Sequence, residues 1–173
     1  QMDPESFVFG PYKIDPNEVF YTTGLSYAMV NLRPVLEGVF FVCNECLDTK
    51  RRKHVLVCPR RIVKRFVDLS AEETTDLWFT AQKIGNQLET HHKASSLTFT
   101  IQDGPQAGQT VPHVHIHVLP RRVDDFENND DVYDAINLKE MELKKKLDLD
   151  KERKDRSIEE MSSEAAEYRK LFI

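Results

Sequence analysis

Three histidines at alternate positions are the residues of this sequence with the clearest chemical potential. His113, His115 and His117 are separated by single aliphatic residues in the run HVHIHV. Successive side chains of a β-strand point to opposite faces, so an extended backbone would place the three imidazoles on one face and the aliphatic residues on the other. A row of imidazoles above an apolar layer is costly unless each ring has a partner or a task.

Three interpretations of this row are open. The histidines can be hydrogen-bonded residues of a half-buried strand, or they can bind a metal. A metal site explains the row less well, because His113 and His117 lie about 13 Å apart along a strand and one ion leaves one ring over. In covalent catalysis, the neutral imidazole of His115 attacks phosphorus while its neighbours bind the phosphate oxygens and handle a proton. We favour covalent catalysis because it gives each ring a task.

The loop before the histidines carries groups that suit a phosphate. Gly104 and Gly108 let backbone amides approach a phosphate closely. Gln102 and Gln109 add neutral amide donors, which stabilise oxygens that gain charge in a transition state. The loop and the histidine row together predict a site that binds and attacks phosphorus.

Strands and helices must position these groups. The capping-box sequence Ser70-Ala71-Glu72-Glu73 and a 3.6-residue apolar period predict a helix over Ala71–His91. A second capping box, Ser157–Glu160, predicts a C-terminal helix whose apolar stripe of Ile158, Met161, Ala165, Tyr168 and Phe172 docks on the body. Runs rich in β-branched and aromatic residues predict strands over Phe7–Phe9, Val19–Thr22, Leu25–Leu32, His54–Cys58, Ser96–Gln102 and Val111–Leu119.

Composition narrows the function classes. A chain of 173 residues that is 40% hydrophobic suits one compact domain, and a net charge of −5 argues against binding nucleic acid by bulk positive charge. No apolar run is long enough to span a bilayer, so we expect no membrane partner. The three cysteines form an odd set without an export signal, which favours a reducing location. We expect the cytoplasm, and the nucleus in addition. Dense mixed charge predicts a solvated, partly mobile segment over 126–156.

The stretch from Gln102 to Arg121, QDGPQAGQTVPHVHIHVLPR, resembles the signature of the histidine-triad (HIT) superfamily. Its GQTV lead-in and LPR follow-on resemble the Fhit branch, the dinucleoside triphosphate hydrolases. The resemblance extends over nearly the whole chain. It implies an α+β, HIT-like fold in a single domain over 1–173, with a five-stranded antiparallel sheet, one long helix and a C-terminal helix. It also implies that the sheet continues across a homodimer.

The resemblance implies hydrolysis of diadenosine triphosphate to AMP and ADP through a nucleotidyl-histidine intermediate. His115 would be the nucleophile, and His117 would contact the scissile phosphate with His54 beside it. His113 would orient the nucleophile mainly through its backbone carbonyl, and Gln109 would bind the phosphate or the leaving group.

The resemblance also implies the substrate-binding residues. Asn31 and Gln102 would hold the nucleoside and its ribose, and the remaining contacts would come from Phe9, Tyr12, Gly108, Thr110 and Val111. Divalent magnesium or manganese would arrive on the substrate phosphates. We therefore expect no tightly bound cofactor and assign no metal ligands. Tyr133 falls where the family has a mobile loop that reaches the polyphosphate, or it is an ordinary exposed loop residue.

One departure from the family pattern is an insertion over 39–53, where the family turns directly from the Gly38 position into His54. It contains Cys43 and Cys46, which could be half of a zinc site, but an exposed disordered insertion is favoured. The insertion leaves the His54 side of the pocket in question. Two other functions stay open: an adenosine phosphoramidase or adenylylsulfate hydrolase with the same nucleophile, and a nucleotide-binding signalling module with slow turnover. The complete histidine row favours an enzyme.

Overall fold

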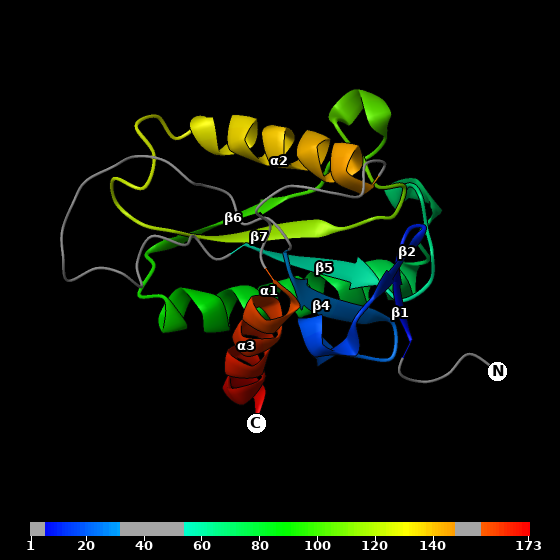
Figure 1. Ribbon diagram of the computed structural model, residues 1–173, viewed down its shortest axis with the longest axis horizontal. Coiled ribbons are helices and arrows are strands. Elements are labelled where there is room, and N and C mark those ends of the chain that lie inside the picture. The colour runs from blue at the N-terminus through cyan, green and yellow to red at the C-terminus, as the bar shows by residue number, and fades with distance from the viewer. Residues whose placement is uncertain (1–5, 32–53, 148–156) are drawn as a thin grey trace.

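The structure is a computed structural model that describes residues 6–31, 54–147 and 157–173 (Figure 1). The insertion predicted at 39–53 lies outside these residues, and so does the end of the charged segment predicted at 126–156. No helix in the described ranges is long and apolar enough to cross a membrane.

A five-stranded antiparallel sheet forms the centre of the fold and confirms the α+β class (Figure 1). Its order is β3-β4-β5-β7-β6, so the strand that carries His117 lies between β5 and β6. The strands are β3 Val19–Thr22, β4 Ser26–Val30, β5 Val55–Pro59, β6 Ser96–Thr100 and β7 Ile116–Arg121. A separate hairpin pairs β1, Phe7–Phe9, with β2, Tyr12–Ile14. The strand β1 was predicted from the sequence, whereas β2 was not.

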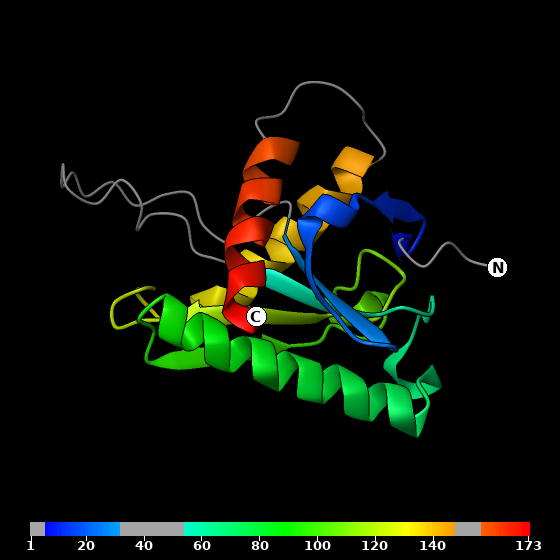
Figure 2. The same ribbon diagram turned by 90° about the horizontal axis from the view of Figure 1, so that it is seen from below.

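Two helices pack on one face of the sheet. They are α1, Ala71–His91, and α3, Ile158–Arg169, and each begins at the predicted capping box. Figure 2 shows α1 lying along the sheet with α3 beside it. The aliphatic residues of the histidine run pack into this core with α1 and α3. Met161, Ala165 and Tyr168 are buried as predicted, whereas Ile158 is 57% exposed.

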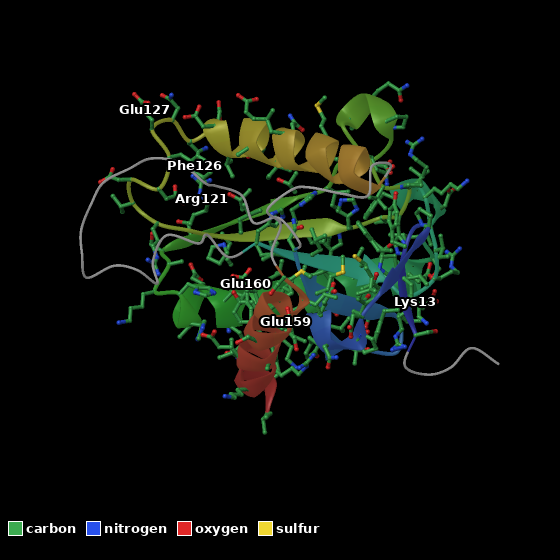
Figure 3. All side chains as sticks on the ribbon, in the orientation of Figure 1. Lys13, Arg121, Phe126, Glu127, Glu159 and Glu160 are labelled. Carbon is green, nitrogen blue, oxygen red and sulfur yellow. The ribbon has the colours of Figure 1, made fainter. Side chains whose placement is uncertain are left out.

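The opposite face of the sheet is covered by a hairpin and another helix. The β1–β2 hairpin packs Phe7 and Phe9 against residues of β4 and β5. Helix α2, Asp131–Leu147, packs Val132 and Ile136 against Leu119 of β7. The turn before α2 is held by Arg121, whose guanidinium binds Asp125 and lies 4.8 Å from the ring of Phe126 (Figure 3).

The strand predicted over Val111–Leu119 is shorter in the structure, because β7 begins only at Ile116. Pro112 has no N–H for a ladder, and the N–H of His113 donates to the carbonyl of Val111 at 2.8 Å. The N–H of Val114 donates to the carbonyl of Val63, which precedes α1. The first part of the row is therefore paired with a loop, while its alternation of faces is kept.

The described residues also contain four short 3-10 helices, at Pro16–Glu18, Phe66–Asp68, Pro105–Ala107 and Lys170–Phe172. Tyr133, predicted in a loop, lies instead in the first turn of α2. The loop interpretation was wrong at this residue because Val132 and Ile136 form an apolar pair, four residues apart, that docks the helix.

Candidate active site

The three histidines of the row lie on the face of the sheet opposite the main core, as predicted. Their side chains are buried, and the ring centroids of His115 and His117 are 4.8 Å apart. The ring of Phe9 meets that of His115 edge-on, with centroids 5.0 Å apart. The β1–β2 hairpin therefore forms one wall of the site and limits the positions that the central imidazole can take.

One hydrogen bond assigns the protons of His115. Its Nδ1 lies 2.7 Å from the backbone carbonyl oxygen of His113. A carbonyl oxygen can only accept, so Nδ1 carries the proton and Nε2 carries the lone pair. When Nε2 of His115 forms a bond to phosphorus, the imidazole ring gains positive charge and its Nδ1–H becomes more acidic. The carbonyl of His113, which accepts from this N–H, would stabilise that charge. This is the contact that the family resemblance implied for His113.

A chain of three side chains assigns the protons of His117. The amide nitrogen of Asn31 lies 3.0 Å from Nδ1 of His54, and Nε2 of His54 lies 2.7 Å from Nδ1 of His117. Because the amide NH₂ can only donate, Nδ1 of His54 accepts, its Nε2–H donates to His117, and His117 carries its proton on Nε2. Burial lowers the pKa of His54 to about 3, so this middle ring is neutral near pH 7. The three hydrogen-bonded side chains together present the Nε2–H of His117, which suits a phosphate oxygen.

His113 differs from the other two histidines because both of its ring nitrogens hold the fold together. Nε2 donates to the carbonyl of Pro59 and Nδ1 accepts from the N–H of Gly10, each at 2.9 Å. Burial lowers the pKa of His113 to about 4, which keeps this doubly bonded ring neutral. The ring of His113 therefore has a structural role, whereas its backbone carbonyl accepts the hydrogen bond from His115.

Gln102, which follows the end of β6, joins the histidine face. Thr100 lies opposite His117 in the sheet, and Gln102 follows two residues later on the same side. Its amide packs against Gly108, whose φ is +92° and where an added Cβ would lie 2.6 Å from Nε2 of Gln102. A side chain at Gly108 would therefore displace Gln102.

Asn137 of α2 is a residue that the sequence analysis missed. Its Oδ1 accepts a hydrogen bond from Nε2 of Gln102. The one local signal is its place directly after the apolar pair that docks α2, and this signal does not indicate a partner 35 residues away.

Gln109 uses both ends of its carboxamide inside the loop. Its Oε1 accepts from the N–H of Gly104 at 3.0 Å, and its Nε2 donates to the carbonyl of Lys64 at 2.9 Å. Asp103 ties the same loop to Arg65 and to the N–H of Phe66. The loop is thus braced from the segment before α1, and the phosphate contact of Gln109 stays a prediction.

The remaining predicted substrate contacts lie around the hairpin and α2. Val111 is buried in the hairpin cluster and Tyr12 packs against that cluster. Tyr133 is 46% exposed and, with Arg121 and Arg122, lines a cavity of about 510 Å³ beside β6. The substrate contacts predicted for Tyr12, Val111, Tyr133 and Thr110 stay predictions.

Comparison with known proteins agrees with this geometry. Residues 45–124 match the HIT domain. A protein of Arabidopsis thaliana named bifunctional bis(5'-adenosyl)-triphosphatase/adenylylsulfatase FHIT is 66% identical over 167 residues, which cover 96% of this chain and 84% of that protein. A bis(5'-adenosyl)-triphosphatase of Dictyostelium discoideum is 49% identical and covers 95% of this chain and 91% of its own.

Two solved structures resemble the whole chain. The C. elegans NitFhit protein matches with a TM-score of 0.70 and 37% identity, over 99% of this chain and 31% of that one. The Plasmodium falciparum diadenosine triphosphate hydrolase, solved with cyclomarin A, matches with a TM-score of 0.69 and 29% identity, over 99% of this chain and 87% of that one. The histidine row lies on one face of a five-stranded sheet, and the similar proteins are Fhit proteins and bis(5'-adenosyl)-triphosphatases. The chain therefore belongs to the histidine-triad (HIT) family, in its Fhit branch.

Proposed function

We propose that this protein hydrolyses dinucleoside polyphosphates, with diadenosine triphosphate giving AMP and ADP, through a nucleotide covalently bound to His115. The observation that carries this proposal is the bond from Nδ1 of His115 to the carbonyl of His113, which assigns the lone pair to Nε2. The names of the relatives support the substrate, since the similar proteins of Arabidopsis and Dictyostelium are bis(5'-adenosyl)-triphosphatases.

The reaction divides into two displacements at one phosphorus. First, the lone pair on Nε2 of His115 forms an N–P bond, and the P–O bond to ADP breaks with its electron pair leaving on ADP. The N–H of His117 stabilises the phosphate oxygens that gain charge. Second, water attacks the same phosphorus, the N–P bond breaks, and its electron pair returns to Nε2. The proton of the water passes to solvent, and AMP leaves.

Hydrolysis in ¹⁸O-water tests the substrate and the phosphorus that is attacked. The protein should convert diadenosine triphosphate to equal amounts of AMP and ADP, and ¹⁸O should appear only in AMP, because water attacks the phosphorus that His115 held. Chromatography with mass spectrometry of both products gives the answer. Label in ADP, or no turnover of dinucleoside polyphosphates, would contradict the proposal.

Adenylylsulfate is a second candidate substrate, since the name of the Arabidopsis relative includes adenylylsulfatase. His115 would attack the same adenylyl phosphorus, and sulfate would leave in place of ADP. Adding adenylylsulfate and adenosine phosphoramidate to the assay would rank these substrates by kcat/KM. Tight binding of every nucleotide with negligible turnover would instead favour a signalling module.

We propose that magnesium or manganese enters on the substrate. Both are hard cations that prefer oxygen ligands, and a polyphosphate offers such oxygens, whereas the histidine face offers nitrogen. The cation would neutralise part of the charge on ADP as it leaves.

We propose that the protein forms a homodimer in which β6 lies at the interface. In the described part of the chain, β6 ends the sheet, and an unpaired edge is a template for pairing with another strand. Trp78 of α1 is 41% exposed and Phe99 of β6 is 37% exposed. Phe99 packs near Gly85, which lies seven residues after Trp78 and so on the same side of α1. A second copy would bury both aromatic rings while it extends the sheet.

Light scattering after size exclusion tests the dimer. The unaltered protein should elute with twice the mass of one chain, and Trp78→Glu should shift it to the monomer because a buried charge without a partner is costly. Val67→Glu is the matched control, since Val67 is 75% exposed and lies outside β6 and α1. A monomeric mass for the unaltered protein would refute the dimer.

A further inference from the structure

We propose that Asn137 on α2 is a positioning residue, which orients the carboxamide of Gln102 so that its oxygen faces a donor group of the bound nucleotide. The inference rests on the proposed function and deepens it. It assigns α2 a part in nucleotide affinity, although α2 follows the histidine row in the sequence and packs on β7 through Val132 and Ile136.

The two ends of the Gln102 carboxamide have different surroundings. Its Nε2 donates to Oδ1 of Asn137. Its Oε1 is buried and has no hydrogen-bond partner among the described residues, and Gln102 as a whole is only 8% exposed. A buried acceptor without a donor costs about 1–3 kcal/mol. A hydroxyl or N–H group of the ligand would remove that cost on binding.

With its Oδ1 turned towards Gln102, Asn137 favours this orientation over the reversed one. A carboxamide can turn over and exchange its oxygen and nitrogen, but the reversed form would place the oxygen of Gln102 against the oxygen of Asn137. Gly108 packs on the same amide and leaves little room for a different rotamer. While Asn137 keeps its oxygen towards Gln102, Gln102 therefore presents an acceptor. The ligand group that it recognises must be a donor, and the hydroxyls of a ribose are of this kind.

The position of Asn137 is set by the docking of α2. Ile136, its neighbour in sequence, is 1% exposed, and Val132, one turn earlier, is fully buried. Arg121 holds the preceding turn through its paired bonds to Asp125. The helix thus holds Asn137 at the end of β6 where Gln102 lies.

A double-mutant cycle on Asn137 and Gln102 tests this inference. Calorimetry gives the Kd for AMP, and steady-state kinetics gives KM and kcat for diadenosine triphosphate. Asn137→Ala should weaken AMP binding and raise KM by about 3–10-fold, the loss of one hydrogen bond, and should change kcat less. In a Gln102→Ala background, Asn137→Ala should have no further effect. Asp134→Ala, an exposed change on the same helix, should leave Kd and KM unaltered.

A purely structural contribution of Asn137 would give a different result. The effects of the two substitutions would then multiply, and Asn137→Ala would lower the thermal midpoint without a selective effect on Kd. Either multiplication or an unchanged Kd overturns the inference while hydrolysis by the unaltered protein continues. If the unaltered protein neither binds AMP nor hydrolyses the substrate, the proposed function falls and the inference with it.

Discussion

The His115→Ala protein should lose both hydrolysis of diadenosine triphosphate and formation of the labelled covalent intermediate. The nucleophile is the group through which both displacements pass, so kcat should fall by about 10⁴–10⁶-fold. His117→Ala should cost less, because it removes a hydrogen bond to the phosphate and leaves the attacking nitrogen in place.

Rapid acid quenching of the protein with adenine-labelled substrate measures this effect directly. The unaltered protein should carry acid-labile label within one turnover, and His115→Ala should carry none. His91→Ala is the matched control, since His91 lies on α1 and pairs with Glu167 of α3 at 2.7 Å, away from the row. Label that persists on His115→Ala would assign the nucleophile to another residue.

Acidification should destabilise this protein well before its carboxylates are protonated. Burial lowers the pKa of His54 to about 3 and that of His113 to about 4, whereas an unfolded histidine titrates near 6.5. Between these values the unfolded chain binds more protons than the folded one, so the free energy of unfolding decreases as the pH falls. It should be nearly constant above about pH 7 and then approach a loss of about 1.4 kcal/mol per pH unit for each imidazole, the limit for one proton.

Urea unfolding between pH 7.5 and 4.5 measures this slope. Glu73, whose pKa Arg61 lowers to about 2, loses its contribution only below about pH 4.5, so the histidines dominate the chosen window. His113→Gln should be less stable at pH 7.5 but should show a smaller slope, because one titrating group is gone. A free energy of unfolding that is flat over this range would show that the buried imidazoles accept protons without loss of structure.

The histidine row illustrates how far local patterns reach. Alternation over six residues was enough to predict that three imidazoles share a face, because the period of an extended chain is local geometry. Likewise, the capping boxes at Ser70 and Ser157 marked the starts of α1 and α3, since the bonds of a helix start join residues three apart. The packing of Tyr168 in the core followed from its place on the stripe of α3.

By itself, the sequence determined the family, the α+β class, the faces of the histidine row and the ends of its best helices. Only the tertiary structure decided the proton pattern, because Asn31 reaches His54 over 23 residues and His54 reaches His117 over 63. It also decided that β7 starts late, that the ring of His113 binds the fold, and that Asn137 meets Gln102. These contacts depend on strand order and register, which the packing of distant segments sets and no local period encodes.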